Sequence, residues 1–278
     1  MFLECVVNVS EGRDERVLSG LTATAGSVLL DLHRDPDHHR SVLTLAGEDD
    51  EVDQAVRALA AEAVARIDLR SHQGVHPRAG ALDVVPFVPY RPGRPPEYDL
   101  SMTVPHRDDF ARWLSARFGI PCFLYGPLPG GQSRTLPQLR RHAFRAIAPD
   151  FGPIHPHRTA GATMVGARSA LVAYNVWVSS VAVARRVAPL IRGPAVRALG
   201  LAVGERAQVS CNLVDPTTLG PAQLYDLVVA GVEAAGGTIL GTELVGLVPQ
   251  SVLHAVPPSR WSELGLSADR TVESRLGR

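Results

Sequence analysis

The clearest element of the sequence is EVDQAVRALAAEAVARI, residues 51–67. Its apolar side chains recur three and four positions apart, which predicts a helix with one buried face. They are Val52, Ala55, Val56, Leu59, Ala63, Val64 and Ile67. SVLTLAG (41–47) precedes this helix and ALDVVPFVPY (81–90) follows it, and both runs are typical of buried strands. We therefore predict a helix that joins two strands of one sheet.

Two further strands and a helix upstream complete a recognisable unit. FLECVVNV (2–9) and SVLLDL (27–32) predict strands, and the residues between about 13 and 24 have a weak helical pattern. The order is then β-α-β-β-α-β, which is the order of the ferredoxin-like unit.

The same order returns in the second half of the chain. Strands are predicted at 169–178, 196–203, 207–214 and 238–249, and helices at 181–191 and 219–236. Between the halves, a helix at 106–118 and the strand PCFLYG (121–126) precede a stretch rich in Gly, Pro and Arg. That stretch, from 127 to about 166, predicts a functional loop or a linker.

These patterns predict an α/β (α+β) protein built from two ferredoxin-like βαββαβ subdomains. We expect the subdomains at residues 1–166 and 167–255, with a C-terminal tail at 256–278. Packing two such small sheets together would leave a ligand cleft or tunnel between them, where binding sites tend to occur.

Composition excludes several classes of protein. The 278 residues carry no net charge, whereas a general nucleic-acid binder has a basic excess. The N-terminus lacks the pattern of a signal peptide, and no apolar stretch is long enough to span a bilayer. Cys5, Cys122 and Cys211 are odd in number and widely spaced, which indicates buried thiols rather than disulfides. We expect a cytoplasmic protein without nucleic-acid or membrane partners.

The stretch SHQGVHPRAGALD, residues 71–83, places two histidines four positions apart. Such a pair on one helical face can bind zinc, and the segment DPDHHR (35–40) could add a third ligand. Gly74 and Pro77 oppose a regular helix, however, which weakens the argument for a metal. The histidines could also be satisfied loop residues without any chemical role.

A third function for the histidines is proton transfer. In a βαββαβ unit, the loop between strands two and three can lie near the loop before strand four. His76 would then lie near the Asp35–Arg40 segment. A carboxylate beside an imidazole orients the ring and supports its protonated form, so this arrangement would give a general acid–base pair.

A series of blocks resembles the formiminotransferase domain of the formiminotransferase-cyclodeaminase family. The blocks run in the family's order and span both halves of the chain. They are ECVVNVSEGR, DPDHHRSVLTLAG, IDLRSHQGVHPRAGALDVVPFVP, PCFLYG, TLPQLR, APDFGP, GATMVGAR, AYNV, QVSCNLVD and LVGLVP. No cyclodeaminase domain follows, so the chain resembles the stand-alone glutamate formiminotransferase form.

The resemblance implies two α/β subdomains with folate in a tunnel between them, commonly as a homodimer. It implies transfer of a formimino group from N-formiminoglutamate to N5 of tetrahydrofolate, a step of histidine degradation and one-carbon metabolism. Tetrahydrofolate would be a co-substrate, and no metal is expected. Because the attacking nitrogen loses a proton and the leaving amine gains one, one side chain that titrates near neutrality can serve both steps.

The resemblance also implies residue roles. The family's catalytic histidine is the one followed by Pro-Arg, which is His76 here, and His72 matches a supporting histidine. Asp35 and Asp37 are the carboxylates expected to pair with His76. The residues expected to bind the substrates are Asn8, Ser10, Glu11, Arg40, His72, Arg78, Gly152, Pro153, Gly161, Ala162 and Thr163.

The chain departs from its relatives at two positions of these blocks. His39 stands where many relatives have asparagine, and Ala160 stands where they often have an aromatic residue. A relative with a different formimino or formyl donor or acceptor therefore stays an alternative. So does a non-catalytic folate-binding or metal-binding module, although such a module has no evident need of His76.

Overall fold

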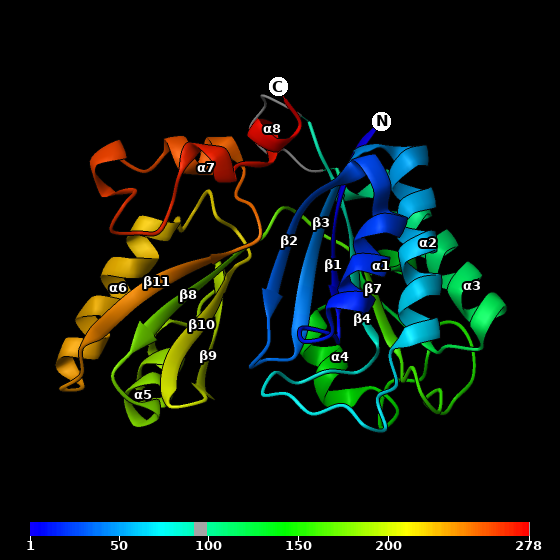
Figure 1. Cartoon of the computed structure of the whole chain (residues 1–278), viewed down its shortest axis with the longest axis horizontal. Coiled ribbons are helices and arrows are strands. Elements are labelled where there is room, and N and C mark those ends of the chain that lie inside the picture. The colour runs from blue at the N-terminus through cyan, green and yellow to red at the C-terminus, as the bar shows by residue number, and fades with distance from the viewer. Residues whose placement is uncertain (92–98, 278) are drawn as a thin grey trace. The chain divides into compact units, whose positions relative to one another are not determined.

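The computed structural model describes residues 1–91 and 99–277, and its contacts divide the chain into two units (Figure 1). Among the described residues, the first unit comprises 1–91 and 99–168, and the second comprises 169–277. Both units combine helices with a single sheet, so the predicted fold class is confirmed. No helix in the described ranges is long and apolar enough to cross a membrane.

The first unit begins with the predicted βαββαβ order. Its elements are β1 (Phe2–Val9), α1 (Glu15–Ala25), β2 (Leu29–Asp35), β3 (Arg40–Glu48), α2 (Asp49–Arg66) and β4 (Leu82–Pro89). The strands lie in the order β2-β3-β1-β4, with antiparallel neighbours, as in a ferredoxin-like sheet. Helices α1 and α2 lie side by side on one face of the sheet, where alternate β1 residues Leu3, Cys5 and Val7 are fully buried (Figure 1).

Further elements extend this sheet to seven strands. They are α3 (Val104–Phe118), β5 (Cys122–Pro127), β6 (Ser133–Arg134), α4 (Leu136–His142) and β7 (Thr163–Ala167). Strand β7 lies parallel to β4 on one side and to β5 on the other. The stretch predicted as a loop therefore contains one helix, α4, and two strands of the sheet, β6 and β7.

The signal for α4 is a capping box, which a search for hydrophobic periodicity overlooks in so short a helix. The Thr135 hydroxyl accepts from the backbone N–H of Gln138, and the Gln138 side chain accepts from the Thr135 N–H at 2.8 Å. Together these bonds satisfy two helix N–H groups that would otherwise lack partners.

The second unit repeats the plan. Its elements are β8 (Val172–Val178), α5 (Val181–Ile191), β9 (Val196–Val203), β10 (Arg206–Leu213), α6 (Pro221–Ala234) and β11 (Ile239–Val245). The strand order β11-β8-β10-β9 is again the ferredoxin-like order. Alternate β10 residues Val209, Cys211 and Leu213 join α5 and α6 in one hydrophobic core.

The predicted C-terminal tail is packed against the second unit. It follows α7 (Gln250–His254) and includes α8 (Val272–Arg275). Leu264 and Val272 are fully buried, and the Leu264 carbonyl accepts a 2.7 Å hydrogen bond from the Tyr174 hydroxyl. The tail packs here because its apolar residues complete the core of this unit. Its helical segments are too short for hydrophobic periodicity to predict this packing.

Candidate functional site

Four segments of the first unit converge at one end of its sheet: the β1–α1 turn (10–14), the β2–β3 turn (36–39), the α2–β4 loop (67–81) and the segment before β7 (157–162). The backbone N–H of Ser10 donates to the Ala81 carbonyl at 2.8 Å, and the Ala81 N–H donates to a carbonyl of the last segment at 2.9 Å. These bonds place residues far apart in sequence around the histidine stretch.

His76 is held in this loop by Arg40. One terminal guanidinium nitrogen of Arg40 lies 2.6 Å from Nε2 of His76 and 2.9 Å from Nδ1, and the other donates to the Asn8 side-chain oxygen. Nδ1 of His76 also lies 2.7 Å from the Pro77 carbonyl. Because a carbonyl only accepts and a guanidinium only donates, Nδ1 carries the hydrogen and Nε2 accepts from Arg40. The arrangement fixes a neutral imidazole.

The surrounding charges disfavour protonation of His76 at rest. Burial is the main cause that lowers its pKa to about 2, and the guanidinium groups of Arg40 and Arg140 lower it further. Burial also lowers the pKa of Arg40 to about 10, with Arg140 and Arg78 acting in the same direction and Asp83 against it. Three arginines thus concentrate positive charge around a neutral histidine.

Asp35 contacts a different histidine from the one expected. Its carboxylate lies 3.1 Å from Nδ1 of His38 and accepts the His38 backbone N–H at 2.7 Å. Burial acts to raise the pKa of Asp35, but the hydrogen bonds to His38 outweigh it and the pKa is lowered. The His38 ring lies edge-on to His76, with 5.8 Å between centroids, so Asp35 reaches His76 through His38. Asp37 is exposed.

His72 adopts a second neutral arrangement in the same loop. Its Nε2 lies 3.0 Å from the His39 carbonyl and donates to it, and its Nδ1 accepts from Arg78 at 2.7 Å. Burial, followed by the charges of Arg78 and His39, lowers the pKa of His72 to about 4. His72 therefore links the β2–β3 turn to Arg78 rather than facing His76 as a metal-binding pair.

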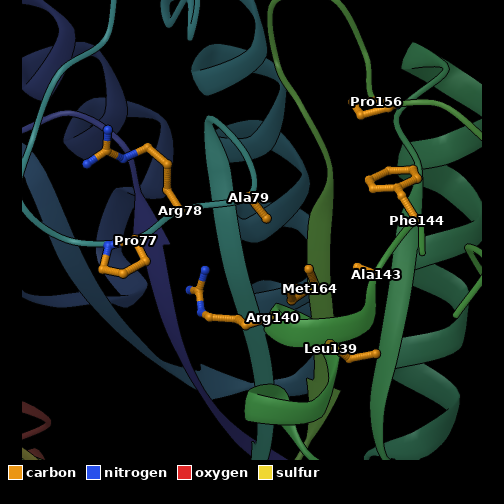
Figure 2. Close-up of a pocket in the computed structure, with 9 residues that line it drawn as sticks. All are labelled: Pro77, Arg78, Ala79, Leu139, Arg140, Ala143, Phe144, Pro156 and Met164. Atoms are coloured by element: carbon orange, nitrogen blue, oxygen red, sulfur yellow. The ribbon is translucent and has the colours of Figure 1, made fainter. Parts of the chain in front are cut away.

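A cavity of about 280 Å³ opens beside the histidine loop. It is lined by Pro77, Arg78, Ala79, Leu139, Arg140, Ala143, Phe144, Pro156 and Met164. Figure 2 shows Arg78 and Arg140 on one side and Phe144 with Ala143 and Leu139 on the other. Paired guanidinium groups suit a carboxylate, and the apolar side suits a flat ring.

Sequence reasoning missed Arg140, which α4 places at this cavity. Its guanidinium donates to the Asp83 carboxylate at 2.6 Å, and Asp83 is 1% exposed. The capping box at Thr135 was the available signal, because it predicts the helix that carries Arg140.

Of the predicted binding residues between α4 and β7, one group lies beside the histidine loop and the other lies away from it. Gly161 forms a β-bridge with Gly80, the Ala162 N–H donates to the Ala79 carbonyl, and these residues adjoin the histidine loop. Thr163 follows directly and donates its hydroxyl to the Leu82 carbonyl at 2.8 Å.

Gly152 and Pro153 lie elsewhere, beside the junction of α3 and β5. Both are exposed, and a side chain at Gly152 would meet the Ser115 hydroxyl at 2.4 Å. Ala160 is 1% exposed within the hydrophobic core, so this position is an interior one. Among residues 1–91 and 99–277, no three His, Cys, Asp or Glu side chains are placed to hold a metal ion.

The two ferredoxin-like units and the arginine–histidine site define an α/β protein suited to anionic substrates and proton transfer. Residues 2–168 match the family model described as the formiminotransferase domain, N-terminal subdomain. Glutamate formimidoyltransferase of Streptococcus pyogenes serotype M1 is 35% identical over 275 residues, covering 90% of each chain. The Thermoplasma acidophilum glutamate formimidoyltransferase is 32% identical, covering 90% of this chain and 89% of that one.

The chain therefore belongs to the formiminotransferase family. It is also 33% identical to the formimidoyltransferase-cyclodeaminase of Sus scrofa, where it spans 51% of the length of that relative.

Proposed function

We propose that this chain transfers a formimino group from N-formiminoglutamate to N5 of tetrahydrofolate, with His76 as the proton carrier. Family membership and the glutamate formimidoyltransferases at 35% and 32% identity support the reaction. The observation that carries the site is the position of His76 against Arg40, beside a cavity with two more arginines.

The residues at the cavity fit a tetrahydrofolate co-substrate. Arg78 and Arg140 would bind a carboxylate, and Phe144 and Met164 would contact an apolar ring surface. When bound, tetrahydrofolate supplies the attacking nitrogen. Gly161 to Thr163 adjoin the same loop and are further candidates for contact.

His76 gains its basicity through the substrates. Burial and, after it, the charges of Arg40 and Arg140 lower the pKa of His76, and a substrate carboxylate that pairs with either arginine offsets the contribution of that charge. Once Arg40 turns to that carboxylate, Nε2 of His76 is free to accept the proton that the attacking nitrogen loses. The same proton then goes to the nitrogen of the departing glutamate, so one imidazole serves both transfers.

The other predicted residues act around His76 in this proposal. Asp35 fixes His38, whose ring edge contacts His76, and thereby limits the orientation of His76. Asp37 contributes through its backbone, because its carbonyl accepts the Val75 N–H at 3.3 Å within the loop. His72 orders the loop with Arg78.

The test is a direct assay of purified protein with tetrahydrofolate and N-formiminoglutamate. His76→Ala should lower turnover by about 10²–10⁴ while tetrahydrofolate still binds, as expected for loss of a general acid–base. His254→Ala, at an exposed position of the second unit, is the matched control and should turn over like the wild type.

Unchanged turnover in His76→Ala would show that another group moves the proton. Wild-type protein that binds tetrahydrofolate without forming product would point to a different formimino or formyl donor.

We further propose a cytoplasmic homodimer that needs no metal. The family resemblance supports the dimer, and the neutral overall charge is consistent with small-molecule partners only. Light scattering during gel filtration measures the oligomeric state. Metal analysis of active protein tests the third point, since about one ion per chain and loss of activity on chelation would contradict it.

A further inference from the structure

His39 lies in the β2–β3 turn with a backbone φ of 49°. Asparagine, aspartate and histidine are the side-chain-bearing residues that tolerate this left-handed conformation best. The conformation directs the His39 ring onto that of His72, with 3.9 Å between centroids and 15° between planes. His39 thus packs against the loop that carries His76.

Both ring nitrogens of His39 face hydrogen-bond acceptors. Nδ1 lies 2.9 Å from the Gln73 carbonyl, and Nε2 lies 3.1 Å from a carboxylate oxygen of Glu11. A backbone carbonyl and an ionised carboxylate have no hydrogen to donate. Each ring nitrogen can therefore bond its oxygen only by donating a hydrogen. The His39 side chain is 14% exposed, so water competes little for these bonds.

The Glu11 partner is itself fixed. The same oxygen accepts backbone N–H groups of Gly12, Arg13 and Asp14 at 2.8, 2.6 and 2.9 Å. Burial acts to raise the pKa of Glu11, but the N–H groups of Asp14 and Arg13 and the proximity of His39 outweigh it and lower the pKa. His39 is therefore attached at one end to a rigid, ionised group.

Gln73, the acceptor at the other end, lies next to the point where the α2–β4 loop and the β2–β3 turn come closest to each other. A side chain placed at Gly74 would meet the His38 carbonyl at 2.3 Å and the His39 Cβ at 2.7 Å. The two loops are thus in backbone contact here, three residues or fewer from His76.

We propose that His39 is a positioning residue for His76: its ring bridges Glu11 and Gln73 and so docks the α2–β4 loop onto the β1–α1 turn. The proposal deepens the function proposed above and rests on the role of His76.

Several polar groups surround His39. Glu11 on the β1–α1 turn is in direct contact through its carboxylate. His72 on the α2–β4 loop is stacked against it in neutral form, with the Arg78 guanidinium behind it. On its own turn, His38 is adjacent in sequence, and its backbone N–H donates to the Asp35 carboxylate.

The test compares His39→Ala with His39→Asn. Asparagine tolerates the backbone conformation and keeps a side-chain N–H donor group, whereas alanine has none. His39→Ala should lower kcat by about 10- to 100-fold with little change in KM for tetrahydrofolate, because a misplaced catalytic group affects turnover. His39→Asn should recover most of that loss.

A second measurement does not depend on turnover. Trypsin should cleave after Arg70, an exposed residue of the loop, faster in His39→Ala than in the wild type at the same pH. Altered cleavage in a protein without formimino transfer would leave the bridge standing and reject only the proposed function. Wild-type kcat and wild-type cleavage in His39→Ala would overturn the bridge itself.

Discussion

The two units share one strand order and differ in their connections. In the first unit, β2 and β3 are joined by residues 36–39, and α2 and β4 by residues 67–81. In the second, residues 204–205 join β9 to β10, and residues 235–238 join α6 to β11. Each of these connections is longer in the first unit than its counterpart in the second. Those of the first unit hold His38, His39, His72 and His76, whereas those of the second hold no histidine.

The difference separates what the fold does from what the loops do. The same βαββαβ plan buries a core in each unit, but only the first adds the polar connections that bring histidines and arginines together. A fold thus supplies a rigid frame, and the chemistry depends on the segments inserted between its elements.

The largest expected effect on this comparison comes from Gly161, whose φ is 70° and whose added side chain would meet the Ala79 carbonyl at 2.2 Å. We expect Gly161→Ala to lower the free energy of unfolding by more than about 3 kcal/mol, since steric overlap adds to backbone strain. Gly204→Ala in the second unit shares a φ of 60° but meets open space, so about 1–2 kcal/mol is expected. Urea unfolding measures both. Equal losses would show that loop contacts add no constraint to the first unit.

Removal of the guanidinium beside His76 should have the next largest effect. We expect Arg40→Met to reduce kcat/KM by about 10- to 100-fold, because a carboxylate loses a charged partner. The pKa of His76 should rise from about 2, because the charge of Arg40 acts together with burial to lower it. Steady-state kinetics and the NMR titration of His76 measure these changes.

Arg197→Met is the control from the second unit, because Arg197 is an exposed residue of β9 whose guanidinium donates to the Gly193 carbonyl. It should leave kcat/KM unchanged. Wild-type kinetics in Arg40→Met would remove Arg40 from substrate binding.

The smallest expected effect is the contribution of His72 to the pH dependence of the free energy of unfolding. His72 has a pKa of about 4 when folded and about 6.5 when unfolded, so the unfolded chain binds the proton first as pH falls. The stability that neutral His72 contributes is complete above about pH 6.5 and declines toward pH 4. Urea unfolding at pH 7 and pH 5 should therefore show a smaller loss in His72→Gln than in the wild type. His254→Gln in the second unit should lose as much as the wild type, and an identical loss in His72→Gln would contradict the shift.

Hydrophobic periodicity predicted the long elements well. The helix at 51–67 corresponds to α2, and the βαββαβ order holds in both units, because each element buries a regular apolar face. Periodicity could not predict α4 or β7. The first is seven residues long, and the second, TMVGA, is rich in small residues typical of loops.

The site was partly predictable. The order of strands and loops indicated that residues 35–40 and 71–80 would meet, and the structure places Arg40 against His76. The partner of Asp35 was not predictable, because the choice between His38 and His76 depends on how the turn folds back on itself. The contribution of Arg140 required the position of α4.

The cysteines give each unit its own reporter of opening. Cys5 and Cys122 lie in β1 and β5 of the first unit, and Cys211 lies in β10 of the second. Burial raises the pKa of Cys122 and Cys211 to about 12, and that of Cys5 well above its usual value. A thiol reagent can react only when a sheet separates. Mass spectrometry of timed alkylation would therefore resolve the opening rate of each unit within one unmodified molecule.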